Sequence, residues 1–591
     1  MSLKDVLSPF KVWERAARKP WTVKNPIDER KGSANYRGFH KNDLEKCIGC
    51  GTCEDICQNL AIDLVPVENV ETNMGDSGLR PMIDYGRCCW CALCVDVCPT
   101  GSLNMSNEYN WIEEEAEGFR FIPGADKKSW DDSDKGYHQS DDIQLIDPAR
   151  IVMEELEAEE RKSTFVEMVK GYSKEKALLE AERCLECGIC VARCPAHMDI
   201  PEYIKAIRED DIELAVKILY ETNPFSASCG RICTHSCEEV CALAHNGEPI
   251  AIRWLKRYIM DQVTPDQIKE IITNNIQVNN KKIAIIGAGP GGLSAAYYLR
   301  LLGYEISVYE SKTKGGGMLR YGIPEYRLPY DQLDKDIDYI ASLGVQINYG
   351  KEIGKDLSFD ELYGNFDAIY FSIGLEKPTS LRCVGEDLDS VVAGVDFLRD
   401  ITDGKRPDIG NDVVVIGGGN VAMDVARTSI RLGANVTVLY RRRIEDMPAD
   451  LEEITEAQEE NVIFNPQSLQ TKIEKAKSGR LLLQWNNMKM VEDPEGDRPK
   501  PIPIEGDLES KEFDTIFSAI GQKADLSFIS EKYEEKMKFK WGKAVTNQFG
   551  QTDIPKVFAG GDVKNWTADA VSAIADGHSA AKGIDEFLQK R

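Results

Sequence analysis

Two stretches of the chain, KKIAIIGAGPGG at residues 281–292 and NDVVVIGGGNVAMD at residues 411–424, decide the fold. In each stretch an apolar, strand-like run leads into closely spaced glycines that open a helix-forming segment. Such a turn lets a pyrophosphate approach the N-terminus of the helix, as in dinucleotide-binding βαβ units. The stretches start 130 residues apart, at 281 and 411, so they predict two separate units.

The first unit carries its fingerprint at Gly287, Gly289, Pro290 and Gly292. Glu310 ends the next strand-like run, 23 residues after Gly287. A carboxylate at this distance accepts hydrogen bonds from a ribose. Strand, turn, helix and acid stand in register, so they predict a dinucleotide site, which we take as the FAD unit.

The second unit repeats the pattern with different chemistry. Its fingerprint is Gly417, Gly419 and Ala422, and Tyr440 stands 23 residues after Gly417 in place of an acid. The next three residues, 441–443, are arginines. An acid would repel a 2′-phosphate, whereas arginine accommodates it. The second unit is therefore predicted to prefer NADPH over NADH, and a solvated basic patch is the alternative.

The sequence offers no nucleophile or paired-carboxylate signature, and we nominate no catalytic side chain. Hydride passes from nicotinamide to flavin without a protein acid or base, and the protein contributes position and electrostatics. No Cys-x4-Cys pair follows the first fingerprint. Thiol–disulfide exchange at the flavin is thus disfavoured.

The chain has 18 cysteines, and two runs with the spacing Cys-x2-Cys-x2-Cys-x3-Cys stand near its start. This is the spacing of bacterial two-cluster ferredoxins, in which the fourth cysteine of each run binds the other cluster. One [4Fe-4S] cluster is therefore predicted on Cys47, Cys50, Cys53 and Cys98, and a second on Cys88, Cys91, Cys94 and Cys57. Zinc is the alternative, but zinc sites use pairs of cysteines, not runs of four.

Two further groups are Cys184, Cys187, Cys190 and Cys194, and Cys229, Cys233, Cys237 and Cys241. Each [4Fe-4S] cluster takes four thiolates. The four groups supply 16 thiolates, enough for four clusters, and leave only Cys89 and Cys383.

Charge and composition exclude some classes of protein. The net charge of −27 argues against nucleic-acid binding, because phosphates would be repelled. The sequence shows no apolar core of a signal peptide and no stretch suited to an integral membrane protein. We expect a cytoplasmic protein in a reducing compartment.

From about residue 146 to 591 the chain resembles the small subunit of NADPH-dependent glutamate synthase. It is also similar to the FAD/NADPH part of dihydropyrimidine dehydrogenase and to the large subunit of NADH-dependent ferredoxin:NADP oxidoreductase. Among the stretches that carry the resemblance are RCLECGICVARCP, CGRICTHSCEEVC, GGGMLRYGIPEYRLP, LYRRRIEDMPA and VFAGGDV. Residues 36–106 are similar to the two-cluster ferredoxin subunit of respiratory complex I.

The resemblance implies ligand sets for the later cysteines. Cys184, Cys187 and Cys190 would share a cluster with Cys241. Cys194, Cys233 and Cys237 would hold another, whose fourth ligand in some relatives is Gln or Glu. Lys256 stands at that position here, and its ammonium cannot bind iron, so we infer that Cys229 completes the set.

The resemblance also implies nucleotide contacts. Those to FAD map onto Gly317, Met318, Arg327, Gly561 and Asp562. Those to NADPH map onto Gly419, Asn420, Val421, Arg441 and Arg442, with Gly521 nearby. In the family the NADPH domain is inserted into the FAD domain.

We therefore predict a multidomain α/β and α+β protein with a bacterial-type ferredoxin domain, an α-helical two-cluster domain and two Rossmann-like domains. The predicted boundaries are an N-terminal arm at 1–45, the ferredoxin domain at 46–106, a linker at 107–145, the helical domain at 146–277, the FAD domain at 278–400 and 520–591, and the NAD(P)H domain at 401–519.

The predicted function is electron transfer between NAD(P)H, FAD and four [4Fe-4S] clusters, to or from a partner such as a ferredoxin or a catalytic reductase or dehydrogenase subunit. A hetero-oligomer is expected. The alternatives are a flavin-based electron-bifurcating subunit, a glutamate synthase small subunit and, least favoured, a non-catalytic iron–sulfur adaptor.

Overall fold

The computed structural model describes residues 11–18, 32–68, 70–140, 145–272, 276–493, 499–534 and 536–590. Two compact units make up the chain. The first comprises Met1–Arg150, Leu185–Cys190 and Glu239–Pro249, and the second comprises Ile151–Cys184, Val191–Glu238 and Ile250–Arg591. Residues 1–10 and 19–31 of the predicted arm lie outside the described residues. Among the described helices, none has the length and apolarity needed to cross a membrane.

The first unit contains a ferredoxin-like domain of short antiparallel strands. One sheet consists of β2 (Ile62–Pro66), β3 (Leu79–Asp84) and β5 (Arg120–Phe121), and a second pairs β1 (His40–Asn42) with β4 (Leu103–Met105). Each cysteine run enters a short helix, α4 (Thr52–Asp55) or α5 (Leu93–Asp96).

The segment 107–145 was predicted to be a linker, but most of it folds onto this domain. Phe121 and Trp130 are buried in the core, and Trp130 stacks on Phe39 with 4.5 Å between ring centroids. These aromatic residues are too far apart along the chain to show a helix or strand period, so the pattern gave no sign of them. Residues 141–144 lie outside the described part.

Helices dominate the start of the second unit: α7 (Lys174–Glu182), α9 (Ile200–Arg208), α10 (Ile212–Thr222), α11 (Ser226–Ile232) and α13 (Ile252–Asp261). A distant carboxylate caps α11. Asp336, on α17 (Tyr330–Ser342), accepts hydrogen bonds from the backbone N–H groups of Ala227 at 3.2 Å and Ser228 at 2.8 Å. This cap fixes the cysteine-bearing helix α11 to the first dinucleotide fold.

The first dinucleotide fold is a five-stranded parallel sheet in the order β22-β9-β6-β7-β8. Its strands are β6 (Lys282–Ile286), β7 (Glu305–Glu310), β8 (Gln346–Tyr349), β9 (Ala368–Phe371) and β22 (Val557–Ala559). Helices α15 (Pro290–Leu301) and α23 (Ala570–Gln589) pack against each other. Because β22 follows the whole second fold in sequence, the second fold is an insertion, as predicted.

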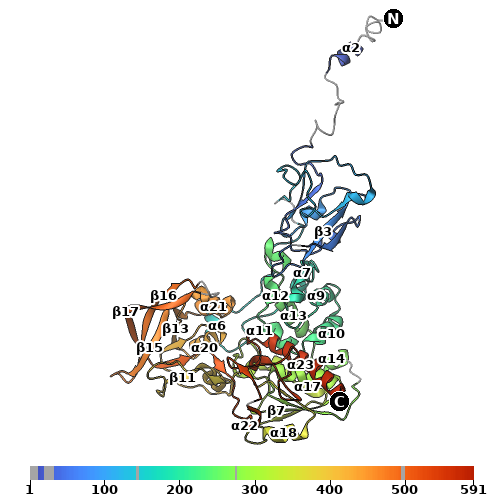
Figure 1. The fold of residues 1–591 in the computed structure, drawn as a ribbon. Helices are drawn as coiled ribbons and strands as arrows, with labels where there is room; N and C mark the ends of the chain where they lie inside the picture. The colour runs from blue at the N-terminus through green and yellow to red at the C-terminus, as the bar shows by residue number, and fades with distance from the viewer. Residues whose placement is uncertain are drawn as a thin grey trace. The chain divides into compact units, whose positions relative to one another are not determined.

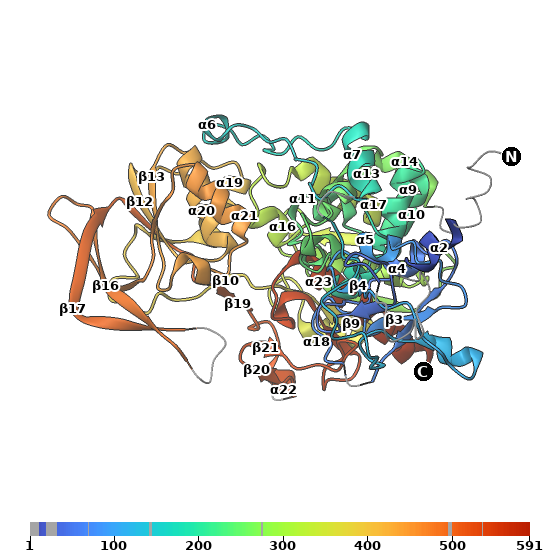
Figure 2. The same cartoon turned by 90° about the horizontal axis from the view of Figure 1, so that it is seen from above.

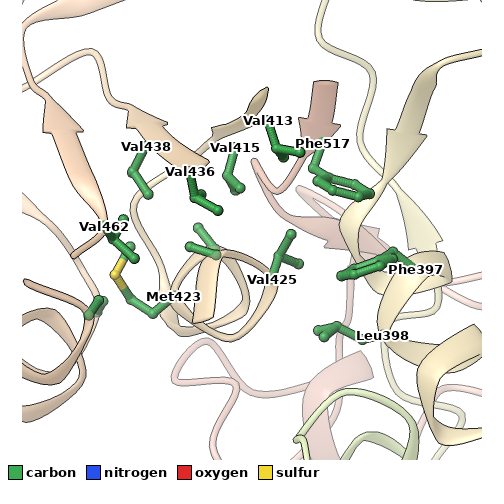
Figure 3. Packing of buried hydrophobic residues seen from close by; sticks show 14 of the residues in the cluster. Phe397, Leu398, Val413, Val415, Met423, Val425, Val436, Val438, Val462 and Phe517 are labelled. Carbon is green, nitrogen blue, oxygen red and sulfur yellow. The ribbon is translucent and has the colours of Figure 1, made fainter. Parts of the chain in front are cut away.

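The second fold is also a five-stranded parallel sheet, in the order β11-β18-β12-β13-β14. Its strands are β11 (Val391–Ala393), β12 (Asp412–Ile416), β13 (Asn435–Leu439), β14 (Ile463–Asn465) and β18 (Thr515–Ser518). Figure 3 shows Val425 of α20 (Asn420–Arg431) directed at the valines of β12, and Met423 of the same helix directed at Val462.

The inserted fold begins earlier in the chain than residue 401. β11 pairs with β18, and Phe397 of α19 (Gly394–Thr402) packs on Phe517 with 4.4 Å between ring centroids. The loop GEDLDS at residues 385–390, which contains a glycine and three acidic residues, directly precedes β11. The segment from Val391 onward therefore belongs to the second sheet.

Alternate residues of the second sheet face two different layers. Val413, Val415, Val436 and Val438 face α20, whereas Val414, Ile416 and Leu439 pack on a three-stranded antiparallel sheet. That sheet consists of β15 (Ser468–Lys475), β16 (Leu481–Val491) and β17 (Lys500–Phe513), drawn in orange in Figures 1 and 2. Both faces of the parallel sheet are thus covered, which suits its continuous apolar strands.

The contact between α23 and α15 depends on Gly577. A Cβ there would lie 2.4 Å from the carbonyl oxygen of Gly291. We expect Gly577→Ala to destabilise the protein by about 1–3 kcal/mol, because the two backbones must separate. Thermal unfolding and the flavin content after purification measure the effect.

The matched control is Gly364→Ala in α18 (Phe359–Asn365), where no atom lies within 4 Å of the added Cβ. This helical position is expected to tolerate alanine without loss of stability. Equal melting temperatures for the two variants would contradict the role of Gly577.

Candidate functional site

A cavity of about 1300 Å³ lies between the two dinucleotide folds of the second unit. This volume exceeds the roughly 300–1,000 Å³ of a single small-molecule site. Predicted FAD contacts that line it are Gly287, Gly289, Pro290, Glu310, Gly317, Met318, Arg327, Gly561 and Asp562. Predicted NADPH contacts that line it are Gly417, Gly419, Asn420, Val421, Arg441, Arg442 and Gly521. Gly292 and Ala422 are buried in their helices and do not line it.

The two fingerprint turns present free helix N-termini to the cavity. Gly289 precedes α15 and Gly419 precedes α20, and neither helix start receives a side-chain cap. Gly287 has φ 99°, and a Cβ there would lie 2.5 Å from the Ser372 carbonyl oxygen. Uncapped N–H groups with a positive helix end fit the pyrophosphate of a dinucleotide.

Glu310 stands at the end of β7, beside the first turn. Its carboxylate accepts hydrogen bonds from the backbone N–H groups of Ala288 and Lys312, both at 2.8 Å. Burial raises the pKa of Glu310, and these two hydrogen bonds oppose the rise. The carboxylate is thus oriented toward the cavity with acceptor capacity left for ribose hydroxyls.

Asp562 lies at the other side of the FAD half of the cavity. Burial raises its pKa to about 6, and nearby Lys543 opposes the rise. The backbone N–H of Gly561 donates to Asp576 at 3.0 Å, which fixes the turn that carries Asp562. A buried carboxyl of this kind fits a hydrogen-bonding role toward a bound cofactor.

In the second half, Asn420 and Asp450 are linked reciprocally. The Asn420 side chain donates to Asp450 Oδ2 at 3.1 Å and accepts from the Asp450 backbone N–H at 2.9 Å. The ring of Tyr440 lies against Gly418, where a Cβ would come within 2.6 Å of it. The Asn420 side chain is thus fixed at the start of α20, where it lines the cavity.

The three arginines after β13 differ in their partners. Arg443 is paired with Asp446 at 2.8 Å. Arg441 and Arg442 line the cavity, and among the described residues neither makes an ion pair. Two guanidinium groups without carboxylate partners at the end of a strand fit a ribose 2′-phosphate.

Arg327 lines the cavity, but its guanidinium group is engaged in ion pairs. Its guanidinium contacts Asp424 of α20 at 2.8 Å and Glu453 at 2.5 Å. The resemblance pointed to a flavin contact, and the ion pairs add a second role that the sequence gave no reason to expect. Arg327 joins the FAD domain to the inserted domain.

In the first unit, a small cavity has the four cysteines of the first predicted cluster in its wall: Cys47, Cys50, Cys53 and Cys98. The set joins three cysteines of one run to the last cysteine of the other, as the ferredoxin spacing predicts. Burial raises the pKa of Cys50 to about 11. A cluster would supply the positive iron charge that stabilises such buried thiolates.

Cys57, Cys88, Cys91 and Cys94 lie close enough for the charge of each to affect the others. Burial raises the pKa of Cys88 to about 11, and its neighbours add to the rise. His40 is buried, and its Nε2 lies 3.3 Å from Cys94 Sγ while its Nδ1 lies 2.6 Å from the Tyr85 hydroxyl. His40 could not be recognised from the sequence, because it is 54 positions from Cys94.

The helical cysteines divide between the units. Cys187, Cys190 and Cys241 belong to the first unit, and Cys184 to the second. Cys187 lies close enough to Cys50 to raise its pKa, after the larger effect of burial. Throughout the described ranges, no three His, Cys, Asp or Glu side chains form a site for a single metal ion.

Cys194, Cys229, Cys233 and Cys237 all belong to the second unit. Their charges act on one another and on Lys256. Ile232 and Thr234, which flank Cys233, line the nucleotide cavity. This cysteine set therefore lies beside the space that the nucleotides would fill.

Three family models match the chain. Residues 46–102 match a 4Fe-4S dicluster domain, and residues 161–268 match dihydropyrimidine dehydrogenase domain II, 4Fe-4S cluster. Residues 281–577, which are 297 of the 591 residues, match the pyridine nucleotide-disulphide oxidoreductase model. The chain belongs to this oxidoreductase family. With its iron–sulfur domains it is an iron–sulfur flavoprotein of that family, and the predicted fold class is confirmed.

Relatives of this oxidoreductase extend the comparison. The NADP(+)-dependent formate dehydrogenase subunit beta of Moorella thermoacetica is 37% identical over 429 residues, which are 68% of this chain and 60% of the relative. The NADPH-Fe(3+) oxidoreductase subunit beta of Geobacter sulfurreducens is 38% identical, over 68% of this chain and 64% of the relative. The glutamate synthase [NADPH] small chain of Escherichia coli is 32% identical, over 76% of this chain and 99% of the relative. The predicted resemblance to the glutamate synthase small subunit is thus confirmed.

The unpaired arginines generate a nucleotide-selectivity prediction. Replacing Arg441 and Arg442 together by alanine is expected to weaken NADPH at least tenfold, about 1.4 kcal/mol, with little change for NADH. Steady-state kinetics and direct binding with both nucleotides measure the difference. Arg443→Ala is the control, because Arg443 is already paired with Asp446. Equal losses for both nucleotides would contradict the assignment.

Proposed function

We propose that this chain is an NADPH-linked electron-transfer subunit that passes electrons between NADPH, FAD and four [4Fe-4S] clusters and exchanges them with a partner redox protein. One observation carries the proposal: a single cavity is lined by both nucleotide fingerprints and by Ile232 and Thr234, the neighbours of Cys233. The relatives named as NADPH- or NADP-dependent support the choice of nucleotide.

The chain's own residues would position the two nucleotides. The N-termini of α15 and α20 bind the pyrophosphates, Glu310 binds the FAD ribose, and Arg441 and Arg442 bind the 2′-phosphate of NADPH. When bound, the nicotinamide and flavin supply hydride transfer, and the clusters supply one-electron carriers. The protein holds the reacting rings together in one cavity and needs no acid or base of its own.

The cysteine sets would bind the clusters, with the ligands assigned above. Within the first unit, the proximity of Cys187 and Cys50 supports transfer between the clusters that these residues would bind. We propose that the ferredoxin-like domain spans residues 36–140 and that the inserted NADPH domain spans residues 391–519, within a FAD domain at 278–390 and 520–591.

The partner would be a catalytic subunit or a ferredoxin. Two of the relatives are named as beta subunits, one of a formate dehydrogenase and one of an Fe(3+) oxidoreductase. This chain spans less than two thirds of the length of those relatives. Its terminal electron donor or acceptor can be identified by co-purification from the native host, followed by an activity assay with the captured subunit.

Anaerobic titration of the purified chain with NADPH, and separately with NADH, tests the function. We expect about 16 irons per chain, bleaching of the flavin by NADPH, and cluster signals in electron paramagnetic resonance (EPR) spectra as the flavin is reduced. Flavin reduction without any cluster signal would overturn the electron path. Reduction by NADH alone would overturn the nucleotide assignment and leave the architecture standing.

A pair of cysteine variants tests whether the fourth cysteine of each ferredoxin run binds the cluster of the other run. Cys57→Ser is expected to remove the cluster of the second ferredoxin run, lowering iron from about 16 to about 12 per chain. Cys89→Ser is the matched control, because Cys89 is exposed and lies outside the predicted sets. Iron analysis and EPR measure the outcome. Equal iron in the two variants would show that Cys57 is not a ligand.

A further inference from the structure

Lys256 is a buried cation at the contact of two helices. Its side chain lies on α13 and is 4% exposed. The backbone of α13 touches α11 next to it, since a Cβ on Gly230 would lie 2.8 Å from Arg257 Cα. Lys256 and Cys229, the residues that precede Arg257 and Gly230, therefore lie close to this helix contact.

The other cations of α13 are neutralised by carboxylates, but Lys256 is not. Arg253 pairs with Glu452 at 2.7 Å, and Arg257 pairs with Glu167 at 3.0 Å. Among the described residues, no carboxylate lies within ion-pair distance of the Lys256 ammonium. A buried charge without a partner costs several kcal/mol, so the fold must supply negative charge in another form.

Four cysteines supply it. The Lys256 ammonium lies within electrostatic range of Cys233, Cys229, Cys194 and Cys237. Arg253 also reaches this region, where it donates to the Cys233 carbonyl oxygen at 3.4 Å.

We propose that Lys256 is the fixed positive charge that raises the reduction potential of the cluster bound by Cys194, Cys229, Cys233 and Cys237. The inference rests on the proposed function. A [4Fe-4S] core with four thiolates carries a charge of about −2 when oxidised and about −3 when reduced, so a nearby cation stabilises the reduced form more. Lys256 is a positioning residue in this sense, because it acts through the cluster.

The position of this cluster explains why a raised reduction potential would matter for electron transfer. Ile232 and Thr234 line the nucleotide cavity on either side of Cys233, so this cluster would border the cavity that holds the flavin. A raised potential makes that cluster the first acceptor of electrons leaving the flavin. The same charge then holds the electron near the flavin until the next carrier is oxidised.

Three variants of the full chain test the proposal, each studied by EPR-monitored redox titration. Lys256→Met removes the charge and keeps the length, and Lys256→Arg keeps the charge. Lys335→Met is the matched control. It removes an ammonium that is similarly buried (9% exposed) but donates to the Met260 and Val263 carbonyl groups. The charges that act on Lys335 are those of Asp336, Asp261, Arg231 and Asp331.

In Lys256→Met we expect one cluster, and only one, to become at least tenfold harder to reduce, a shift of about 59 mV for a one-electron couple. Lys256→Arg and Lys335→Met should stay near the wild-type potentials. The proposal is overturned if no potential moves in Lys256→Met, or if Lys335→Met shifts the same signal equally. Wild-type protein without four cluster signals would instead overturn the proposed function.

Loss of iron is also informative. If Lys256→Met and Lys256→Gln both lose about four irons while Lys256→Arg keeps them, the positive charge is required to hold this cluster, which supports the proposal. If Lys256→Met, Lys256→Gln and Lys256→Arg all lose the iron, Lys256 contributes only to packing, and the proposal fails.

Discussion

Arg427 of α20 is fully buried, and its guanidinium contacts Glu453 at 2.7 Å, Glu456 at 2.5 Å and Glu460 at 2.7 Å. Arg431 shares Glu460, and Arg327 from the FAD domain shares Glu453. The members of such a network are strongly interdependent, because removing one leaves an unpaired charge in a dry interior. The position of the inserted fold over the FAD half of the cavity depends on this network.

The network connects the FAD domain to the helix that carries the NADPH fingerprint. Asp424, which forms an ion pair with Arg327, lies on α20, the helix that begins at the NADPH fingerprint. A second ion pair joins Arg253 of α13 to Glu452 of α21 (Leu451–Glu459), so the helix that packs on the cysteine-bearing α11 is linked to the same domain. Charge pairs fix direction as well as distance, whereas an apolar contact would allow the domains to slide. Ion pairs thus hold the elements on both sides of the cavity together.

The sequence predicted the parts of the molecule whose physics is local. Gly287 and Gly417 mark turns that follow apolar strands, and the cysteine runs have fixed spacing, so both could be recognised from a few neighbouring residues. Three features could not be: the buried Trp130 in the supposed linker, the early start of the inserted fold at Val391, and the pairing of Arg327 with Asp424. Each depends on residues far apart in the chain, and neither periodicity nor spacing records such contacts. The sequence shows Lys256 only as a residue unable to bind iron, whereas the lack of a carboxylate partner among the described residues follows from the fold.

The chain passes from one compact unit to the other five times, at residues 150, 184, 190, 238 and 249. Short segments of the helical region, such as the one that carries Val240, pack in the first unit, where Val240 contacts Gly75. The first unit is therefore built from three separate stretches of the chain. A single cut near residue 150 would leave those returning segments without their packing partners. Evolution could have added this module only together with matching changes in the loops at 185–190 and 239–249, so the two regions should vary in concert among relatives that possess the module.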